Sequence, residues 1–374
     1  MAPSLLKRQA LRTRNGLAHL AGLKRPEVAQ TPRDLVWQRE TARLWRYRSD
    51  DRSIHAPLLI VHSLVSKSYI LDLQPENSMV RYLVGEGFDV YLLDWEPAGP
   101  ADAENTLETY AAGLIPGAIQ ATGADELTLM GYCFGGDLAL LTAAAGADDL
   151  PIRNLVALTT PCDFHAIGFL ADMFRAGRLD ADDVIDDTGL VPAAVMDAAF
   201  QSIKPTDQLV QPLNLWEQLW SAERAENFLA LNGWTRDQVP FPGATFRQTV
   251  ELLVRDNRLA SGELPFAGGT VRLKDIKRPF LNIYCEQDTI VPAPSAEPLT
   301  GLVGSRDATE LKLEVGHVGL VAGRYAEEVA RPAIADWIRR HSVNTQRTSS
   351  AGKHRKTSTP KENGDRHTAR AAAA

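Results

Sequence analysis

The chain has 374 residues, of which 44 % are hydrophobic and 23 % are charged, and this globular mix excludes wholesale disorder, collagen-like repeats and a coiled-coil rod. The three cysteines, Cys133, Cys162 and Cys285, are too few for a disulfide framework, so we expect a reducing, cytoplasmic environment. The sequence has no apolar run of the roughly 18 residues that a transmembrane segment needs, and we expect no secretory signal.

The net charge of −7 is distributed unevenly along the chain. Residues 1–30 and residues 343–374 each carry a net charge of +5, so the body between them carries −17. We expect no nucleic-acid binding by such a body, because phosphates need a basic face. The N-terminal basic segment (residues 1–34) and the basic tail are either solvated or contact an anionic surface or partner. The tail, residues 343–374, has almost no large apolar side chains, which predicts disorder.

Apolar runs and helical patterns alternate along two parts of the chain, residues 35–163 and residues 276–342. The runs predict strands at residues 58–63, 88–94, 127–130, 155–160, 280–284 and 310–315. The intervening patterns predict helices at residues 77–86, 107–122, 135–146 and 325–341. Continuous apolar strands that alternate with helices are typical of a mostly parallel sheet covered on both faces. We therefore expect an α/β fold whose core comprises these two parts.

Residues 164–275 interrupt this alternation. They contain helical patterns, loops and many aromatic side chains, namely Phe169, Phe174, Phe200, Trp216, Trp220, Phe228, Trp234, Phe241 and Phe246. An all-helical insertion of this length in an α/β sheet predicts a lid over the carboxyl edge of the strands, where ligands bind in such sheets.

The sharpest local motif is Gly131-Tyr-Cys133-Phe-Gly135-Gly136, which stands between a predicted strand and a predicted helix. A small-X-nucleophile-X-small turn in this position is typical of the nucleophile elbow of α/β-hydrolases, here with Cys in place of Ser. The glycines leave room for neighbouring chains, and the helix N-terminus favours a thiolate at Cys133. The alternative interpretation is a buried structural cysteine in a glycine-rich turn.

The backbone around this motif also predicts an oxyanion hole. The N–H group of Phe134 would point to the position where a carbonyl oxygen becomes an oxyanion. A second N–H group is expected from the loop that follows the strand at residues 58–63, at Leu64 or Val65.

Two further residues follow in the order that an α/β-hydrolase requires, which is nucleophile, acid, then histidine. Asp288 follows the predicted strand at residues 280–284, and His317 follows the one at residues 310–315. A histidine there can take the proton of the Cys133 thiol, while a carboxylate behind it fixes its tautomer. The order and spacing favour a Cys133–His317–Asp288 triad.

Other candidate residues are weaker. Asp163, just after another predicted strand, is the alternative acid, and His165 is expected to be structural. Cys162 and Cys285 lack the context of an elbow and are expected to be small core residues. No Cys/His grouping has the spacing of metal ligands and no glycine-rich phosphate loop occurs, so we predict no metal site.

Four stretches of the chain carry a more specific pattern. They are residues 69–84 (YILDLQPENSMVRYLV), residues 89–95 (DVYLLDW), the glycine motif at 131–136 and the sequence GHVGL at 316–320. Together they resemble the polyhydroxyalkanoate synthases, also called poly(3-hydroxybutyrate) polymerases, and the resemblance extends from about residue 35 to residue 341. The short N-terminal region and the Gly-His-Val-Gly form are most similar to the smaller class III or class IV catalytic subunits.

The resemblance implies polymerisation of (R)-3-hydroxyacyl-coenzyme A thioesters with release of coenzyme A. It implies that Cys133 holds the growing chain as a thioester, that His317 activates Cys133, and that Asp288 assists activation of the attacking 3-hydroxyl. It implies no resident cofactor, because the substrate carries coenzyme A. It also implies a homodimer, with a second synthase subunit and the surface of polymer granules as partners.

The chain departs from the family pattern at two positions close to the predicted acid. The family usually has His directly after the catalytic Asp and often Trp after Val-Pro, where this chain has Thr289 and Ala293. Two alternative functions remain open: a Cys-dependent thioesterase or ester hydrolase on the same fold, and a catalytically silent granule-associated subunit.

Overall fold

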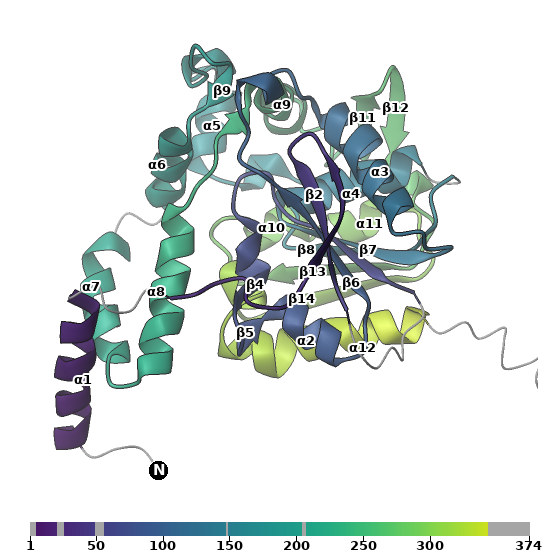
Figure 1. Cartoon of the computed structure of the whole chain (residues 1–374). Coiled ribbons are helices and arrows are strands. Elements are labelled where there is room, and N and C mark those ends of the chain that lie inside the picture. Colours follow the sequence, from purple (N-terminus) through teal and green to yellow (C-terminus); the bar gives the residue numbers. More distant parts are fainter. Residues whose placement is uncertain (1–4, 21–25, 49–55, 147–148, 204–206, 343–374) are drawn as a thin grey trace, which may run out of the picture. The chain divides into compact units, whose positions relative to one another are not determined.

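The computed structural model describes residues 5–20, 26–48, 56–146, 149–203 and 207–342, and the tail at 343–374 lies outside them. Within these residues, eight strands form one sheet in the order β1, β2, β6, β3, β7, β8, β13, β14 (Figure 1). In that order they span Asp34–Arg39, Ala42–Tyr47, Val90–Trp95, Leu58–Val61, Leu127–Tyr132, Ile152–Leu158, Phe280–Cys285 and Ala308–Leu313. The β1–β2 and β2–β6 pairs are antiparallel, and the other neighbours are parallel. The prediction of a mostly parallel sheet flanked by helices is confirmed.

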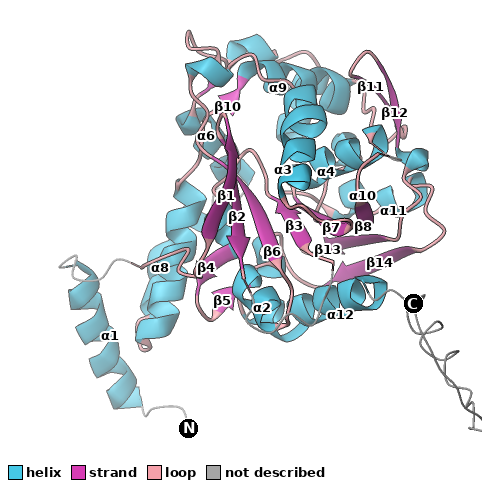
Figure 2. Cartoon of the chain, turned by 45° about the vertical axis from the view of Figure 1, so that its right-hand side comes forward, coloured by secondary structure: helices cyan, strands magenta, loops and turns pink. Residues whose placement is uncertain are grey.

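Helices cover both faces of this sheet. Helices α3 and α4 pack on one face, and α2 and α12 pack on the other (Figure 2). The helices span Leu5–Leu20 (α1), Met79–Gly85 (α2), Ile115–Ala121 (α3), Phe134–Ala145 (α4), Phe169–Arg175 (α5), Ala193–Ile203 (α6), Asp207–Gln218 (α7), Ala222–Arg236 (α8), Gly243–Gln248 (α9), Ala293–Ala296 (α10), Leu299–Leu302 (α11) and Arg331–Ser342 (α12). Short strands outside the main sheet are Asp72–Gln74 (β4), Asn77–Ser78 (β5), Leu190–Val191 (β9), Phe241–Pro242 (β10), Glu263–Phe266 (β11) and Gly269–Arg272 (β12).

The central strands are apolar throughout because both faces of the sheet are buried. Along β3, Leu58 and Ile60 belong to the hydrophobic cluster on the side of α2 and α12. Leu59 and Val61 belong to the cluster on the side of α3 and α4. Successive side chains of a strand point to opposite faces, so a strand between two helical layers needs an apolar residue at every position.

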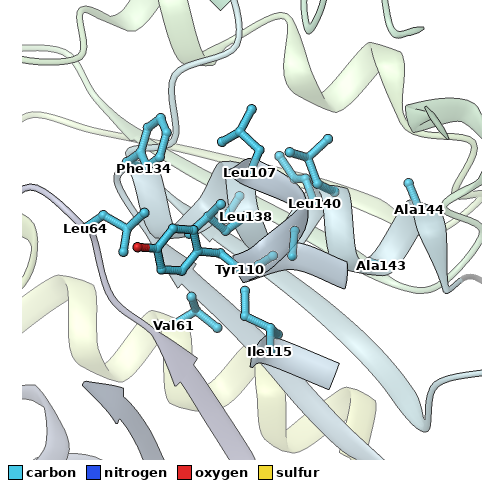
Figure 3. Packing of buried hydrophobic residues seen from close by; sticks show 14 of the residues in the cluster. Val61, Leu64, Leu107, Tyr110, Ile115, Phe134, Leu138, Leu140, Ala143 and Ala144 are labelled. Carbon is cyan, nitrogen blue, oxygen red and sulfur yellow. The ribbon is translucent and has the colours of Figure 1, made fainter. Parts of the chain in front are cut away.

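The start of α4 is packed tightly against the ends of neighbouring strands. A Cβ atom on Gly135 would overlap the carbonyl oxygen of Val61, and one on Gly136 would overlap the side chain of Thr160. Further along the helix, Leu138 joins Val61 in the buried cluster that Figure 3 shows. These contacts fix the N-terminus of α4 at the carboxyl edge of the sheet.

The predicted helix at residues 107–122 contains a π-helical stretch in the structure. Thr109–Leu114 is π-helical and lies between the α-helical residues 107–108 and α3, which begins at Ile115. Pro116 stands in the first turn of α3 and has no N–H group to donate, which accounts for a break in the regular hydrogen-bond ladder at this point.

Residues 164–275 do not form an all-helical insertion, which corrects the prediction. β9 pairs with β10, and β11 pairs with β12, in antiparallel orientation. Each strand of the first pair has only two residues, which is too short to produce an alternating pattern in the sequence. The second pair packs on α4 and contributes Leu264, Phe266 and Val271 to the cluster on that face. This part of the segment therefore lies beside the sheet and not over the carboxyl edge of the strands.

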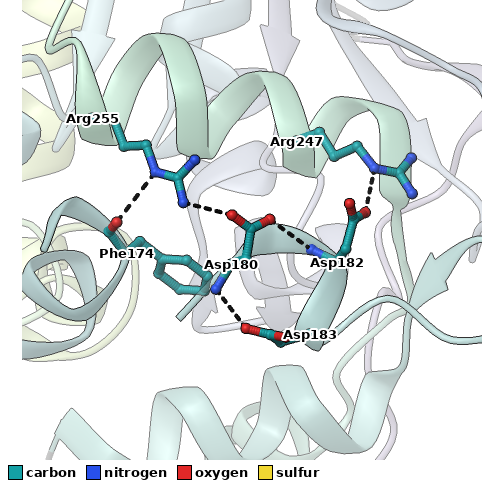
Figure 4. Close-up of polar contacts among 6 residues, drawn as sticks. All are labelled: Phe174, Asp180, Asp182, Asp183, Arg247 and Arg255. Atoms are coloured by element: carbon teal, nitrogen blue, oxygen red, sulfur yellow. Dashed lines mark hydrogen bonds and ion pairs between the residues drawn. The ribbon is translucent and has the colours of Figure 1, made fainter. Parts of the chain in front are cut away.

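Arginine contacts join the early and late parts of the same segment. Arg255 donates to the carbonyl oxygen of Phe174 at 3.2 Å and to Asp180 at 2.8 Å (Figure 4). Arg247 donates to Asp182 at 2.7 Å. Ion pairs on an exposed surface contribute little to stability, so the burial of Phe174 in the core matters more than its polar contact.

The N-terminal basic segment is not a solvated tail where the structure describes it. Arg12 of α1 pairs with Glu217 of α7 at 2.5 Å, and its guanidinium lies 5.7 Å from the ring centroid of Trp216. Asn15 donates to the carbonyl oxygen of Leu219 at 2.7 Å. The residues that contact α1 are about 200 positions away in the chain, so the sequence around α1 could not indicate this contact.

The block at residues 69–84 connects distant parts of the chain. Asp72 accepts a hydrogen bond from the hydroxyl of Thr31 at 2.6 Å. Asn77 accepts one at 3.0 Å from Arg331, a buried residue at the start of α12. The most family-specific stretch of the sequence therefore joins the N-terminal segment and the last helix to the sheet.

The packing of α4 predicts a difference between two glycine substitutions. Gly136→Ala would force the start of α4 away from Thr160, so we expect the free energy of unfolding to fall by at least about 2 kcal/mol. Gly85→Ala is the matched control, because a Cβ there meets nothing within 4 Å. Urea denaturation followed by circular dichroism measures both values. Equal stability of the two variants would contradict the packing described here.

Candidate active site

Cys133 occupies the turn between β7 and α4, with φ at 55° and ψ at −130°. A left-handed backbone at a residue with a side chain costs about 1–3 kcal/mol and persists only where the surroundings impose it. Here the N–H group of Cys133 donates to the carbonyl oxygen of Leu158 at 2.9 Å, and a Cβ on Gly131 would overlap Gly136. The half-buried thiol stands at the N-terminus of α4.

Asp288 and His317 lie side by side at the carboxyl edge of the sheet, after the parallel neighbours β13 and β14. The Nδ1 atom of His317 is 2.7 Å from Oδ2 of Asp288. An ionised carboxylate only accepts, so Nδ1–H of His317 is the donor. The other oxygen, Oδ1, accepts from the N–H groups of Ile290 at 2.8 Å and Val291 at 2.9 Å. The carboxylate is thus held in place through both oxygens.

The electrostatic surroundings of His317 favour its charged form. Burial by itself would lower the pKa of His317, but the Asp288 carboxylate and the Cys133 thiol outweigh it and raise the pKa to about 10. Both neighbours act through charge and through hydrogen bonding. The ring of Tyr132 lies 5.3 Å from the imidazole, centroid to centroid. The structure therefore brings Cys133, His317 and Asp288 together.

The weaker candidates lie in other environments. Asp163 accepts from the side chain of Asn257 at 2.8 Å and from the N–H group of His165 at 3.0 Å, so it holds a turn. His165 itself is exposed. Cys162 and Cys285 are fully buried, and burial raises the pKa of both thiols. These contacts are those of structural residues.

The groups predicted to form an oxyanion hole lie around the same turn. Within the described residues, the backbone N–H groups of Phe134 and Leu64 have no hydrogen-bond acceptor. The N–H group of Val65 is 3.4 Å from the hydroxyl of Ser63. The side chains of Phe134 and Leu64 are buried in the cluster of Figure 3, so only their backbones are available to a ligand.

A cavity of about 430 Å³ opens at Cys133 and His317. Strand-end loops form one wall, and helices α6, α7 and α8 form the other. Its lining includes Ser63, Val65, Ser66, Tyr132, Asp197, Phe200, Gln201, Ile203, Gln211, Leu231, Asn232, Trp234, Thr235, Arg236, Gln238, Gln287, Thr289, Ile290 and Val318. The sequence predicted a helical lid over this edge of the sheet but did not indicate which of its residues line the cavity, because they have an ordinary helical pattern. The only signal was the aromatic richness of this segment, which includes Phe200 and Trp234.

Two other titratable side chains near the thiol are buried, and the sequence did not indicate this. Burial, followed by the charge of Cys133, raises the pKa of Asp137 well above its usual range. Burial, followed by the charge of Lys67, lowers the pKa of His62 to about 3. Within the described residues, neither the carboxyl oxygens of Asp137 nor the ring nitrogens of His62 have a hydrogen-bond partner. Burial therefore disfavours a further charge beside the His317–Asp288 pair.

Comparison with known proteins first shows the class of fold. A family described as "alpha/beta hydrolase fold" matches residues 56–321. A thermophilic esterase from Thermogutta terrifontis is 16 % identical with a TM-score of 0.50, covering 83 % of this chain and 100 % of that one. MenH from S. aureus is 17 % identical with a TM-score of 0.50, covering 80 % and 98 % of the respective chains. The chain has an α/β-hydrolase fold.

More specific matches show the family. A family described as "Poly-beta-hydroxybutyrate polymerase (PhaC) N-terminus" matches residues 24–83. The poly(3-hydroxyalkanoate) polymerase subunit PhaC of Allochromatium vinosum is 33 % identical over 331 residues, covering 86 % of this chain and 92 % of that protein. The subunit of the same name from Synechocystis sp. is 31 % identical over 339 residues, covering 87 % and 89 %. The chain belongs to the poly(3-hydroxyalkanoate) polymerase PhaC family, which confirms the resemblance seen in the sequence.

Two kinds of feature are absent from the described residues. None of their helices is long and apolar enough to cross a membrane. No group of three or more His, Cys, Asp and Glu side chains among them is arranged to hold a metal ion.

The raised pKa of His317 predicts how stability depends on pH. The folded protein keeps a proton that the unfolded chain releases above about pH 6.5, so this stabilisation is complete below pH 6.5 and is lost as the pH rises through about 10. We expect the difference in unfolding free energy between the wild type and His317→Gln to decrease from pH 7 to pH 10. Urea denaturation under reducing conditions measures it. The exposed His165, changed to Gln, is the control, and a constant difference for His317 would contradict the assignment.

Proposed function

We propose that this chain polymerises (R)-3-hydroxyacyl-coenzyme A into polyhydroxyalkanoate, with release of coenzyme A, through an acyl thioester on Cys133. The observation that most strongly supports this proposal is that Cys133, His317 and Asp288 lie together at one end of a cavity, in a chain of the PhaC family. The printed names of the relatives support the substrate class. The reaction needs no resident cofactor, because the substrate brings its own coenzyme A.

In the first step, the proton of the Cys133 thiol is already held by His317, whose raised pKa favours the imidazolium, and the thiolate attacks the carbonyl carbon of the thioester. The negative charge that develops on the carbonyl oxygen is stabilised by the N–H groups of Phe134 and Leu64. The bond to the sulfur of coenzyme A then breaks, and coenzyme A leaves as a thiol with the proton from His317. Asp288 keeps the imidazole oriented throughout by accepting from Nδ1–H.

In the second step, the 3-hydroxyl of another unit attacks the carbonyl of a thioester. Its proton passes to the His317–Asp288 pair and then to the leaving sulfur, so that a C–O ester bond replaces a C–S bond. The histidine serves as base and then as acid, which is the same sequence of roles as in hydrolysis. Whether polymer or free acid forms depends on which nucleophile, hydroxyl or water, reaches the acyl group.

The cavity wall favours the hydroxyl over water in physical terms. Phe200, Ile203 and Leu231 line it on the helical side, and apolar walls exclude water from a reactive ester. Thr289, which replaces the family's usual histidine, also lines the cavity. Ala293, which stands where many members have tryptophan, packs in a cluster with Cys133.

The expected partners belong to the same proposal. We place the activity in the cytoplasm at the surface of polymer granules and expect a homodimer with a second synthase subunit, all of which rest on the resemblance to the family. Purification with and without a co-expressed second subunit, followed by light scattering and an activity assay, tests these expectations.

The function is tested by following coenzyme A and polymer together. The wild type incubated with 3-hydroxybutyryl-coenzyme A should release free thiol and form polymer, and Cys133→Ala should lower both rates by at least about 10³-fold, as expected when a nucleophile is removed. Cys162→Ala is the control, because that buried cysteine lies outside the cavity lining.

Three outcomes would contradict the proposal. Free 3-hydroxybutyrate as the sole product would indicate a thioesterase. A wild type that releases no coenzyme A, with or without the second subunit, would indicate a silent subunit. Equal activity of Cys133→Ala and the wild type would place the nucleophile elsewhere.

A further inference from the structure

The loop at residues 62–67 is held at both ends by tryptophan indoles. At its start, Nε1–H of Trp95 donates to the carbonyl oxygen of His62 at 2.9 Å. At its end, Nε1–H of Trp234 donates to the carbonyl oxygen of Lys67 at 2.8 Å. Both tryptophans are buried, with 5 % and 7 % of their surface exposed. A backbone segment with a fixed hydrogen bond at each end has little freedom to reorient the peptide groups between them.

Residues between these two points line the cavity that opens at Cys133. They are Ser63, Val65 and Ser66. The loop also begins close to the first turn of α4, because a Cβ on Gly135 would lie 2.6 Å from the carbonyl carbon of His62. Within the described residues, the N–H group of Leu64 in this loop has no hydrogen-bond acceptor, and its side chain shares a buried cluster with Phe134 of that turn.

The two tryptophans come from different parts of the molecule. Trp95 ends the central strand β6 and packs edge-on against Tyr110, with 5.3 Å between the ring centroids, so it belongs to the rigid core. Trp234 belongs to α8 and lines the cavity itself. The hydroxyl of Tyr69 donates to Asp237 at 3.1 Å, which is a second link between the end of α8 and the chain just after the loop.

We propose that Trp234 is a positioning residue, whose hydrogen bond to Lys67 aims the Leu64 N–H group at the acyl oxygen on Cys133. The helix that forms a wall of the substrate cavity then also sets the oxyanion hole. This inference rests on the proposed function, because it assigns Leu64 a role in acyl transfer. Trp95 supplies the fixed end of the same loop.

The inference predicts different effects on two reactions of the Cys133 thiol. Acylation by 3-hydroxybutyryl-coenzyme A passes through an oxyanion and needs the Leu64 N–H group. Alkylation by iodoacetamide forms no oxyanion and needs only an accessible thiolate. Trp234→Phe keeps most of the aromatic surface and removes the donor. We expect it to slow the burst of coenzyme A release by about 3- to 10-fold, the loss of one neutral hydrogen bond, and to leave the alkylation rate unchanged.

Two further variants complete the experiment. Trp95→Phe should lower the acylation rate in the same way, and it serves as the test variant if Trp234→Phe does not fold. Trp337→Phe is the matched control, because its indole donates to Thr309 at 3.1 Å in the hydrophobic cluster of α2 and α12. This control should leave both reactions at wild-type rates. The reduction should appear in kcat and not in KM, since the hydrogen bond acts on the transition state.

An unchanged ratio of acylation to alkylation in both Trp234→Phe and Trp95→Phe would overturn the inference. A parallel loss of both reactions would also overturn it, because that result indicates a general disturbance of the cavity. A wild type that is alkylated at Cys133 but never acylated would instead overturn the proposed function, and it would do so before any tryptophan variant is examined.

Discussion

The contact between the first turn of α4 and the ends of β3, β7 and β8 is the constraint on which the site depends. A helix can approach the sheet this closely only where the approaching residues have no Cβ, which is why Gly131, Gly135 and Gly136 surround the cysteine. The close approach leaves Cys133 with a left-handed backbone and directs its thiol toward the cavity. It also brings the loop that contains the free N–H group of Leu64 against the turn that contains the free N–H group of Phe134. A single packing arrangement therefore positions both the proposed nucleophile and the proposed oxyanion donors.

The order of strands brings the remaining groups to the same edge. β8 separates β7 from β13, and β13 and β14 are parallel neighbours, so the loops after β7, β13 and β14 meet on one side. Asp288 is fixed there by two backbone donors and one imidazole. Burial disfavours the charged forms of two groups close by, Asp137 and His62. In a region of low dielectric, a single ion pair with neutral surroundings interacts more strongly than one among competing charges.

Much of this arrangement was predictable from the sequence, and the parts that were not share a cause. The parallel sheet followed from apolar runs, because strands buried on both faces must be apolar at every position. The positions of Asp288 and His317 after two late strands followed from chain order. The particular lid residues that line the cavity and the contact of α1 with α7 were not predictable, because each depends on residues far apart in the chain. The β9–β10 pair was missed because two residues a strand leave no periodicity, and the link between Trp234 and Lys67 spans 167 positions.

The contact between α1 and α7 has a practical consequence. Helix α7 contributes Gln211 to the cavity wall, and α1 is attached to α7 through an arginine–glutamate pair and an arginine over a tryptophan ring. Charge contacts at the surface weaken as added ions screen them, over a distance of about 8 Å at physiological ionic strength. Raised salt should therefore loosen α1 from the helix that carries Gln211. A purification tag fused ahead of α1 would be attached to the same helix that makes these contacts.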